Sequence, residues 1–201
     1  QHFPISKDEA RTQVVELFRK LGIPDPERRY EAYPHEFSGG MRQRIVIATA
    51  LINSPQLLIA DEPTTALDVT IQAQILDLMR NLQKQMNMSI LLITHDLGVV
   101  AENCDRVLVM YAGKIVESGK TSEVFANPTH PYTVALLNSS PRAAKNVKML
   151  LPTIEGMVMA PSERGIGCSF APRCSRVIEK CHTQTPQLDK GEHAVACWNQ
   201  L

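Results

Sequence analysis

The sequence predicts an α/β fold that contains a parallel β-sheet. Two short apolar runs, 57–60 and 89–94, have the length of buried strands. Between them, residues 69–87 repeat apolar side chains with the period of a helix. A strand, a connecting helix and a second strand favour a parallel pair, because a crossover of this length returns the chain in the same direction.

Further elements are predicted on both sides of this unit. Ser6 and Glu9 match a capping box at the start of an amphipathic helix over 6–21. Residues 106–117 are predicted to form a hairpin with its turn at 112–113. The remaining predicted helices cover 40–53, 96–103, 121–126 and 131–138.

The composition is that of a globular protein without excess charge. The chain has 201 residues, with Lys+Arg and Asp+Glu both 21, so the formal net charge is zero. This balance argues against a nucleic-acid-binding protein that relies on bulk positive charge. The longest apolar run, 45–52, covers eight residues, whereas a membrane-spanning helix needs roughly 20. Any membrane role is therefore expected to act through a partner protein.

The organisation changes near residue 140, where a tail rich in Pro, Gly and Cys begins. We expect three parts: a helical segment over 1–54, a strand-bearing part over 55–140 and a Cys-rich extension over 141–201. The chain begins with Gln1 rather than Met, and we expect that upstream residues are missing.

Acidic residues follow the first predicted strand. Asp61 and Glu62 would stand at the carboxyl edge of the parallel sheet, where such folds bind ligands. In a nucleotide hydrolase an Asp here helps to hold Mg²⁺, and an adjacent Glu polarises the attacking water. His95 follows the neighbouring strand and could contact a γ-phosphate or position the water. The alternatives are two exposed carboxylates that begin a loop and a packed or solvent-facing histidine.

A glycine-rich helix start precedes these residues. Ser38-Gly39-Gly40 offers free backbone N–H groups and the positive end of a helix dipole, which together suit a phosphate. The alternative is an ordinary Ser N-cap followed by flexible residues. Asp68 likewise could simply be the N-cap of the helix over 69–87.

Four motifs, taken in order, resemble those of ATP-binding-cassette ATPases over about residues 1–140. They are the signature Ser38-Gly39-Gly40 with Gln43-Arg44, the Walker B segment Leu57-Leu58-Ile59-Ala60-Asp61-Glu62-Pro63-Thr64, the D-loop Thr65-Ala66-Leu67-Asp68 and the switch histidine in Thr94-His95-Asp96. The resemblance implies the C-terminal portion of a P-loop NTPase (RecA-like) nucleotide-binding domain, in which 1–54 is the helical signature subdomain and 55–140 is part of the core.

In this family two subunits bind ATP head to tail, so the resemblance implies a role for each matching residue. The signature residues, which would contact the γ-phosphate bound by the partner subunit, are Ser38, Gly39, Gly40 and Gln43. Asp61 would serve Mg²⁺, Glu62 would be the general base and His95 would be the switch. Asp68 would couple the two ATP sites across the interface.

The chain departs from the family pattern in one respect. A phosphate loop of the form Gly-x-x-x-x-Gly-Lys-Ser/Thr and the glutamine loop are absent from these 201 residues. Without the lysine and the amides of that loop, the β- and γ-phosphates lose their main binding groups. We therefore expect negligible ATP hydrolysis by this chain alone, although the complete protein is expected to be an ATPase.

Four cysteines in the tail suggest a metal site. Cys168, Cys174, Cys181 and Cys197 could bind Zn²⁺ or a [4Fe–4S] cluster through four thiolates. Their spacing of five, six and fifteen intervening residues is wider than the spacing typical of zinc. Free thiols or a partial disulfide are the third interpretation.

The tail also resembles the C-terminal extension of the dipeptide and oligopeptide importer ATPases. The match lies in residues 167–174, Gly-Cys-Ser-Phe-Ala-Pro-Arg-Cys, and 127–133, Asn-Pro-Thr-His-Pro-Tyr-Thr. Some members of that subfamily carry a [4Fe–4S] cluster on the four cysteine positions, which implies the same ligands here.

The function implied is ATP hydrolysis coupled to the import of di- or oligopeptides. The implied partners are a second ATPase subunit, two transmembrane permease subunits and, indirectly, an extracytoplasmic solute-binding protein. The chain would lie at the cytoplasmic face of the bacterial inner membrane and would bind no nucleic acid. The alternatives are the ATPase of a nickel or other solute importer, and a non-catalytic fragment that acts as an interaction module.

Overall fold

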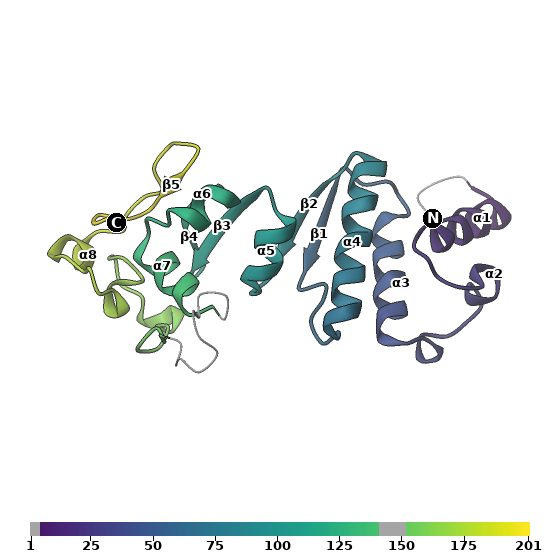
Figure 1. Cartoon of the computed structure of the whole chain (residues 1–201), viewed down its shortest axis with the longest axis horizontal. Coiled ribbons are helices and arrows are strands. Elements are labelled where there is room, and N and C mark those ends of the chain that lie inside the picture. Colours follow the sequence, from purple (N-terminus) through teal and green to yellow (C-terminus); the bar gives the residue numbers. More distant parts are fainter. Residues whose placement is uncertain (1–4, 141–151) are drawn as a thin grey trace. The chain divides into compact units, whose positions relative to one another are not determined.

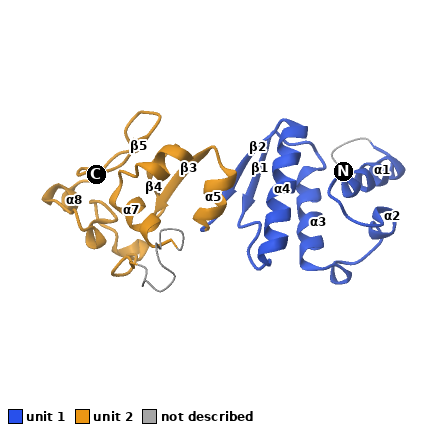
Figure 2. Ribbon diagram, viewed as in Figure 1, with its two compact units in different colours: residues 1–95 blue, residues 96–201 orange. Residues whose placement is uncertain are grey.

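Two units, 1–95 and 96–201, make up the computed structural model, which describes residues 5–140 and 152–201 (Figure 2). The division lies between the predicted second strand and the helix that follows it. The three-part division expected from the sequence, with boundaries near 54 and 140, stays a prediction. The first residues of the expected extension, 141–151, lie outside the described residues.

Unit 1 is a layer of helices packed on a two-stranded sheet. Its elements are α1 (Lys7–Lys20), α2 (Pro26–Arg29), the 3₁₀ helix η1 (Pro34–Glu36), α3 (Gly39–Leu51), β1 (Leu57–Asp61), α4 (Val69–Met86) and β2 (Ser89–Ile93) (Figure 1). The strands β1 and β2 pair in parallel, with Ile59 opposite Leu91. The predicted parallel pair is therefore confirmed.

The capping box predicted for the first helix is present. Ser6 Oγ accepts a hydrogen bond from the backbone N–H of Glu9 at 3.2 Å, and Glu9 Oε2 accepts one from the backbone N–H of Ser6 at 2.8 Å. Both interactions satisfy N–H groups that have no partner within the helix. The buried Phe18 then joins α1 to the core of unit 1.

One face of the β1–β2 sheet forms this core and the other is open. Leu58 and Ala60 of β1 are buried together with Leu51 of α3 and with Ile75 and Met79 of α4. The strand period of two places the opposite set of side chains on the far face. That set is apolar and 42–61% exposed, and it consists of Leu57, Ile59, Leu91 and Ile93.

Unit 2 is built around a three-stranded antiparallel sheet of order β3-β4-β5. Its elements are α5 (Leu97–Asn103), β3 (Arg106–Tyr111), β4 (Lys114–Lys120), α6 (Thr121–Ala126), α7 (Pro131–Asn138), η3 (Pro161–Glu163), η4 (Ala171–Arg173), α8 (Glu179–Thr183) and β5 (Ala194–Val195). The predicted hairpin is β3–β4, and β5 adds a third strand from the tail. Across residues 5–140 and 152–201, no helix combines the length and apolar character that crossing a membrane needs.

The tail shares a core with the β3–β4 hairpin. The ring of Phe170 packs edge-on against Tyr111 of β3, with 5.1 Å between ring centroids. Arg173 donates from Nη1 to the Tyr111 hydroxyl at 3.3 Å, and Arg164 donates from Nη1 to the carbonyl oxygen of Ala112 at 2.8 Å. These contacts join residues that lie more than 50 positions apart in the sequence. The Cys-rich tail is thus packed onto the hairpin.

A buried carboxylate on β4 joins three segments of unit 2. Glu117 is 0% exposed and accepts hydrogen bonds from the backbone N–H and hydroxyl of Thr129, at 2.8 and 3.0 Å, and from the backbone N–H of His130 at 3.0 Å. His193 Nε2, in the tail, lies 2.7 Å from the same carboxylate. Burial acts to raise the pKa of Glu117, but the hydrogen bonds outweigh it and the pKa is lowered. The carboxylate is therefore ionised at neutral pH.

Replacing this carboxylate should destabilise unit 2. The Glu117→Gln side chain directs an amide donor at groups that are themselves donors, and we expect a loss of about 1–3 kcal/mol in the free energy of unfolding. The fluorescence of Trp198, the one Trp of the chain, reports the unfolding of unit 2 directly. Glu192→Gln is the matched control, since the Glu192 side chain is 79% exposed. Equal stability of the two variants would contradict this assignment.

The difference in stability between wild type and Glu117→Gln should depend on pH. Because folding lowers the pKa of Glu117, its stabilising contribution is present above the pKa of an unfolded glutamate, roughly 4.3. That contribution disappears as the pH falls through the lower pKa of the folded state. The difference in stability between wild type and Glu117→Gln should narrow over this acidic range.

Candidate functional site

The parallel pairing of β1 and β2 brings Glu62 and His95 together. Asp61 is the last residue of β1, Glu62 follows it, and His95 lies two positions beyond the end of β2. His95 Nδ1 is 3.0 Å from Glu62 Oε1. All three side chains are exposed. The prediction that His95 stands beside the acidic strand end is confirmed.

Glu62 has a backbone conformation that is rare for a residue with a side chain. Its φ is +44°, in the left-handed region, which costs of order 1–3 kcal/mol for such a residue. Its N–H donates to the carbonyl oxygen of Ile93 at 2.9 Å, which extends the contact between the strands by one residue. The hydroxyl of Thr65 donates to Glu62 Oε2 at 2.8 Å. Sequence reasoning did not single out Thr65, although it lies in the quoted D-loop motif.

The surroundings of Glu62 favour its ionised form. The hydrogen bond from His95 is the largest cause of its lowered pKa, and the hydrogen bond from Thr65 is the second. The side chain is open to solvent, so water can reach it. An ionised carboxylate held in one orientation beside an imidazole can accept a proton from a water molecule.

The helix start at 38–40 is largely exposed and has an ordinary N-cap. Ser38 is the N-cap of α3, and its Oγ accepts a hydrogen bond from the backbone N–H of Met41 at 3.4 Å. Ser38 and Gly39 are exposed, and Gly40 is half-buried. Backbone N–H groups in a first helical turn have no partner within the helix, so those of Gly39 and Gly40 are available. Ser38 can therefore act as the N-cap of α3 while the N–H groups of Gly39 and Gly40 stay open to a phosphate.

Close packing gives a second reason for glycine at position 40. A Cβ on Gly40 would lie 2.9 Å from Cγ2 of Ile71 in α4, closer than real Cβ contacts come. A Cβ on Gly39 would lie 3.7 Å from Cδ2 of Leu67, at ordinary contact distance. The starts of α3 and α4 therefore lie side by side. No pattern in the sequence indicates the contact between Gly40 and Ile71.

The remaining predicted site residues have defined structural positions but untested roles. Asp68 is the N-cap of α4, and its Oδ1 accepts a hydrogen bond from the backbone N–H of Ile71 at 3.0 Å. Gln43 is half-buried on α3. Within the described part of unit 1, no hydrogen bond joins the start of α3 to Asp61 or Glu62. The strand edge and the helix start are thus two groups of site residues that share no hydrogen bond in this part of the chain.

The four tail cysteines are near one another in unit 2. Cys181 is buried and the other three are half-buried. Burial is the main cause that raises the pKa of the Cys168, Cys174 and Cys197 thiols, and the neighbouring thiols of the set raise it further. All four are free thiols. Among residues 5–140 and 152–201, no three or more His, Cys, Asp or Glu side chains are arranged to hold a metal ion.

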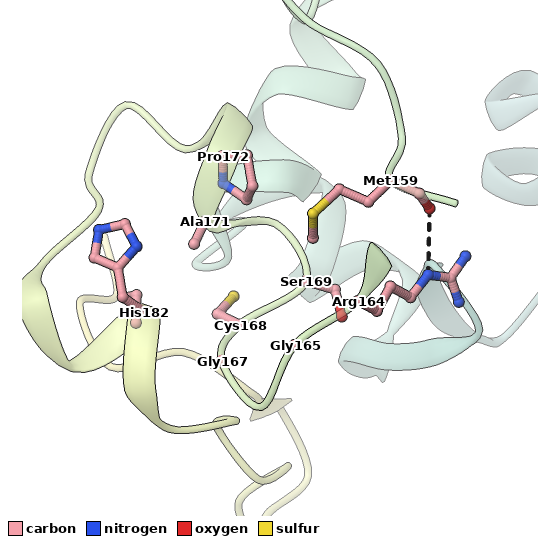
Figure 3. Close-up of a pocket in the computed structure, with 10 residues that line it drawn as sticks. Met159, Arg164, Gly165, Gly167, Cys168, Ser169, Ala171, Pro172 and His182 are labelled. Atoms are coloured by element: carbon pink, nitrogen blue, oxygen red, sulfur yellow. Dashed lines mark hydrogen bonds between the residues drawn. The ribbon is translucent and has the colours of Figure 1, made fainter. Parts of the chain in front are cut away.

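Backbone N–H groups and a small cavity adjoin these thiols. Cys174 Sγ accepts a hydrogen bond from Arg176 N–H and Cys197 Sγ accepts one from Asn199 N–H, both at 3.4 Å. A cavity of about 120 Å³ is lined by residues that include Cys168 and Cys181. Figure 3 shows Cys168 beside Gly167 and Ser169 at this cavity.

The backbone is closely packed at the edge of this cavity. The N–H of Cys168 donates to the carbonyl oxygen of Cys181 at 2.7 Å. A Cβ on Gly167 would lie 2.4 Å from that same oxygen. Glycine is therefore required at position 167 for the two cysteine-bearing segments to approach.

Comparisons with known proteins identify two families along the chain. The family described as "ABC transporter" matches residues 1–65, and the family described as "Oligopeptide/dipeptide transporter, C-terminal region" matches residues 116–181. A probable peptide ABC transporter ATP-binding protein of Sinorhizobium fredii is 54% identical over 98% of this chain and 59% of its own length. The dipeptide transport ATP-binding protein of Bacillus subtilis is 51% identical over 100% of this chain and 60% of its own length.

The chain belongs to the family of peptide ABC transporter ATP-binding proteins. It spans about three fifths of the length of the curated relatives that it matches. The match named for the transporter C-terminal region begins within β4, so this family region includes the strand that carries Glu117.

Solved structures agree with this assignment at the level of the fold. The cbiO1 protein of Clostridium perfringens, part of an ABC transporter complex, superimposes with a TM-score of 0.55 at 32% identity, over 67% of this chain and 51% of that one. An ATP-binding cassette solved in its ADP conformation gives a TM-score of 0.56 at 21% identity, over 68% and 52%. The predicted fold class, an ABC nucleotide-binding domain, is confirmed.

The two signature glycines should differ in their tolerance of alanine. Gly40→Ala places a methyl group against Ile71, and we expect unit 1 to lose about 1–3 kcal/mol in its free energy of unfolding. Gly39→Ala meets no such obstacle and is the matched control. Hydrogen exchange of the α3 and α4 amides measures the stability of unit 1. A loss of the same size in both variants would contradict the packing explanation.

Proposed function

We propose that this chain is part of the ATP-hydrolysing subunit that energises a peptide importer. The observation that carries the proposal is the Glu62–His95 pair, which stands at the carboxyl edge of a parallel sheet directly after Asp61. The family assignment supports it, since the relatives are described as ATP-binding proteins of peptide or dipeptide transport. Those descriptions favour peptides over nickel as the transported solute.

The strand edge supplies the residues proposed for hydrolysis. The ionised Glu62 accepts the proton of the attacking water, while Thr65 and His95 hold its two carboxylate oxygens in place. His95 is also proposed to sense the γ-phosphate. Asp61 is the residue that would hold Mg²⁺, which neutralises charge on the phosphates when it is bound. These residues would position the reacting groups and stabilise the charge that develops on the phosphate. Positioning and charge stabilisation are most of what phosphoryl transfer requires.

The helix start supplies the residues proposed to act on the partner subunit's ATP. Ser38, Gly39 and Gly40 present N–H groups and a positive dipole end to the γ-phosphate, and Gln43 lies one turn further along the same helix. Asp68 would couple the two ATP sites.

The importer would contain further subunits. The proposed partners are a second ATPase subunit, two transmembrane permease subunits and, indirectly, an extracytoplasmic solute-binding protein, with this subunit at the cytoplasmic face of the membrane. A phosphate loop is proposed to lie in the portion of the relatives' length that this chain does not span. The apolar far face of the β1–β2 sheet supports a larger domain, since parallel sheets are normally covered on both faces.

Removal of the Glu62 carboxylate tests this function. In the protein extended to the length of its relatives, Glu62→Gln should lower ATP turnover by roughly 10²- to 10⁴-fold, because the amide cannot accept a proton. ATP binding should persist, since the phosphates are held by other groups. Glu16→Gln, an exposed position on α1, is the matched control. Turnover that survives in Glu62→Gln would remove Glu62 from this role.

We further propose that Cys168, Cys174, Cys181 and Cys197 hold an iron–sulfur cluster of the [4Fe–4S] type. Four neighbouring thiols are the donor set that such a cluster uses, and the N–H groups that donate to Cys174 and Cys197 are of the kind that tune it. The four cysteine side chains as they stand do not form a ligand group for a metal ion. The cluster would cross-link a tail that has little regular structure.

The fifth cysteine provides the control for this proposal. After anaerobic reconstitution of the protein, replacement of any one of the four tail cysteines by serine should abolish or sharply reduce bound iron. Cys104→Ser, in the same unit, should retain it. Iron content and visible absorption measure the result. Zinc at one equivalent would show that the thiols bind a different metal, and equal iron in all variants would contradict the assignment.

A further inference from the structure

Arg42 reaches back from the first turn of α3 to the chain that enters the helix. Its Nε donates to the carbonyl oxygen of Pro34 at 2.9 Å and to the carbonyl oxygen of Phe37 at 3.0 Å. Pro34 begins η1, and Phe37 directly precedes the N-cap Ser38. One guanidinium N–H therefore ties both ends of the short turn that leads into the signature.

The same turn is also anchored by the buried side chain of Phe37, which forms a cation–π contact. The Phe37 side chain is 5% exposed, and the guanidinium carbon of Arg29 lies 5.4 Å from its ring centroid. Phe37 thus has its side chain fixed in unit 1 and its carbonyl fixed by Arg42. The backbone that enters Ser38 has little freedom left between these two restraints.

The two carbonyl oxygens matter because of their charge. Each carries a partial negative charge on the segment next to the amides of Gly39 and Gly40, where an anion is proposed to bind. A cation that binds both oxygens compensates this charge and leaves the positive end of the helix dipole effective. The positive charge of Arg42 itself adds to the attraction of an anion to this end of α3.

We propose that Arg42 is a positioning residue for the helix start that contacts the partner subunit's ATP. It acts through the backbone of residues 34–38, which it holds in the orientation that directs the amides of 39 and 40 at the γ-phosphate. This role rests on the proposed function.

A neighbouring arginine on the same helix shows the contrast. Arg44 also donates to a backbone carbonyl, that of Leu21 at the end of α1. This contact joins the end of α1 to α3 and lies at the opposite end of the connection 22–37, which contains α2 and η1. Arg44 therefore has a stabilising role in the packing of unit 1, whereas Arg42 acts on the turn that enters the signature.

The experiment compares steady-state ATPase kinetics in the protein extended to the length of its relatives. Arg42→Gln should lower kcat by roughly 10- to 100-fold with little change in KM. The reason is that ATP is bound mainly by other groups, whereas the amides of 39 and 40 would no longer be directed at the γ-phosphate. Arg42→Lys should recover part of kcat, since an ammonium can reach one carbonyl but does not reproduce the fixed geometry of Nε. Arg28→Gln, an exposed position on α2, should leave both constants unchanged.

Thermal unfolding separates positioning from stability. Arg44→Gln sets the scale of a purely structural loss, and Arg42→Gln should lower the melting temperature less than Arg44→Gln does. A folded Arg42→Gln protein with kcat within two-fold of wild type overturns the proposal, as does a kcat loss that disappears on cooling. Turnover that depends on Glu62 but not on Arg42 overturns the role of Arg42 alone. A wild-type protein that hydrolyses no ATP overturns the proposed function together with this role.

Discussion

The candidate site depends on the parallel pairing of β1 with β2. Glu62 and His95 are 33 residues apart in the sequence and meet because the two strands run in the same direction and end at one edge. The N–H of Glu62 bonds to Ile93 and so continues the strand contact into the site. The strained φ of Glu62 is sustained by this bond and by the contacts of its side chain. A strained residue held from several sides is typical of functional positions.

Unit 2 depends on a different constraint, the buried charge of Glu117. Burying a carboxylate away from water costs free energy unless hydrogen-bond donors surround it. The segments that donate to Glu117 are therefore fixed next to β4. Those segments are the 129–130 turn and His193 of the tail. The tail consequently closes on the hairpin even though it contains few long helices or strands.

Sequence periodicity predicted the long elements well, and the site residues only in part. The helices α1, α3 and α4, the pair β1–β2 and the hairpin all follow from apolar patterns and capping residues, which are local signals. The two-residue strand β5 and the short helix α8 have no such pattern. Long-range contacts accompany both: β5 pairs with Glu117 and Ser118 of β4, and the carbonyl oxygen of Cys181 in α8 accepts a hydrogen bond from the N–H of Cys168. The strained φ of Glu62 and the contact of Gly40 with Ile71 were equally unpredictable, since neither leaves a trace in spacing or composition.

Two helix starts lie side by side in unit 1, and electrostatics distinguishes them. The start of α4 is capped by Asp68, whose own negative charge compensates the dipole of that helix. The start of α3 is capped by the neutral Ser38 and has no acidic residue in its first turn, so its positive end is uncompensated. A phosphate brought to this end of the unit is therefore attracted to α3 rather than α4. The neutral Ser at one cap and the acidic Asp at the other therefore give the two helix starts different charge.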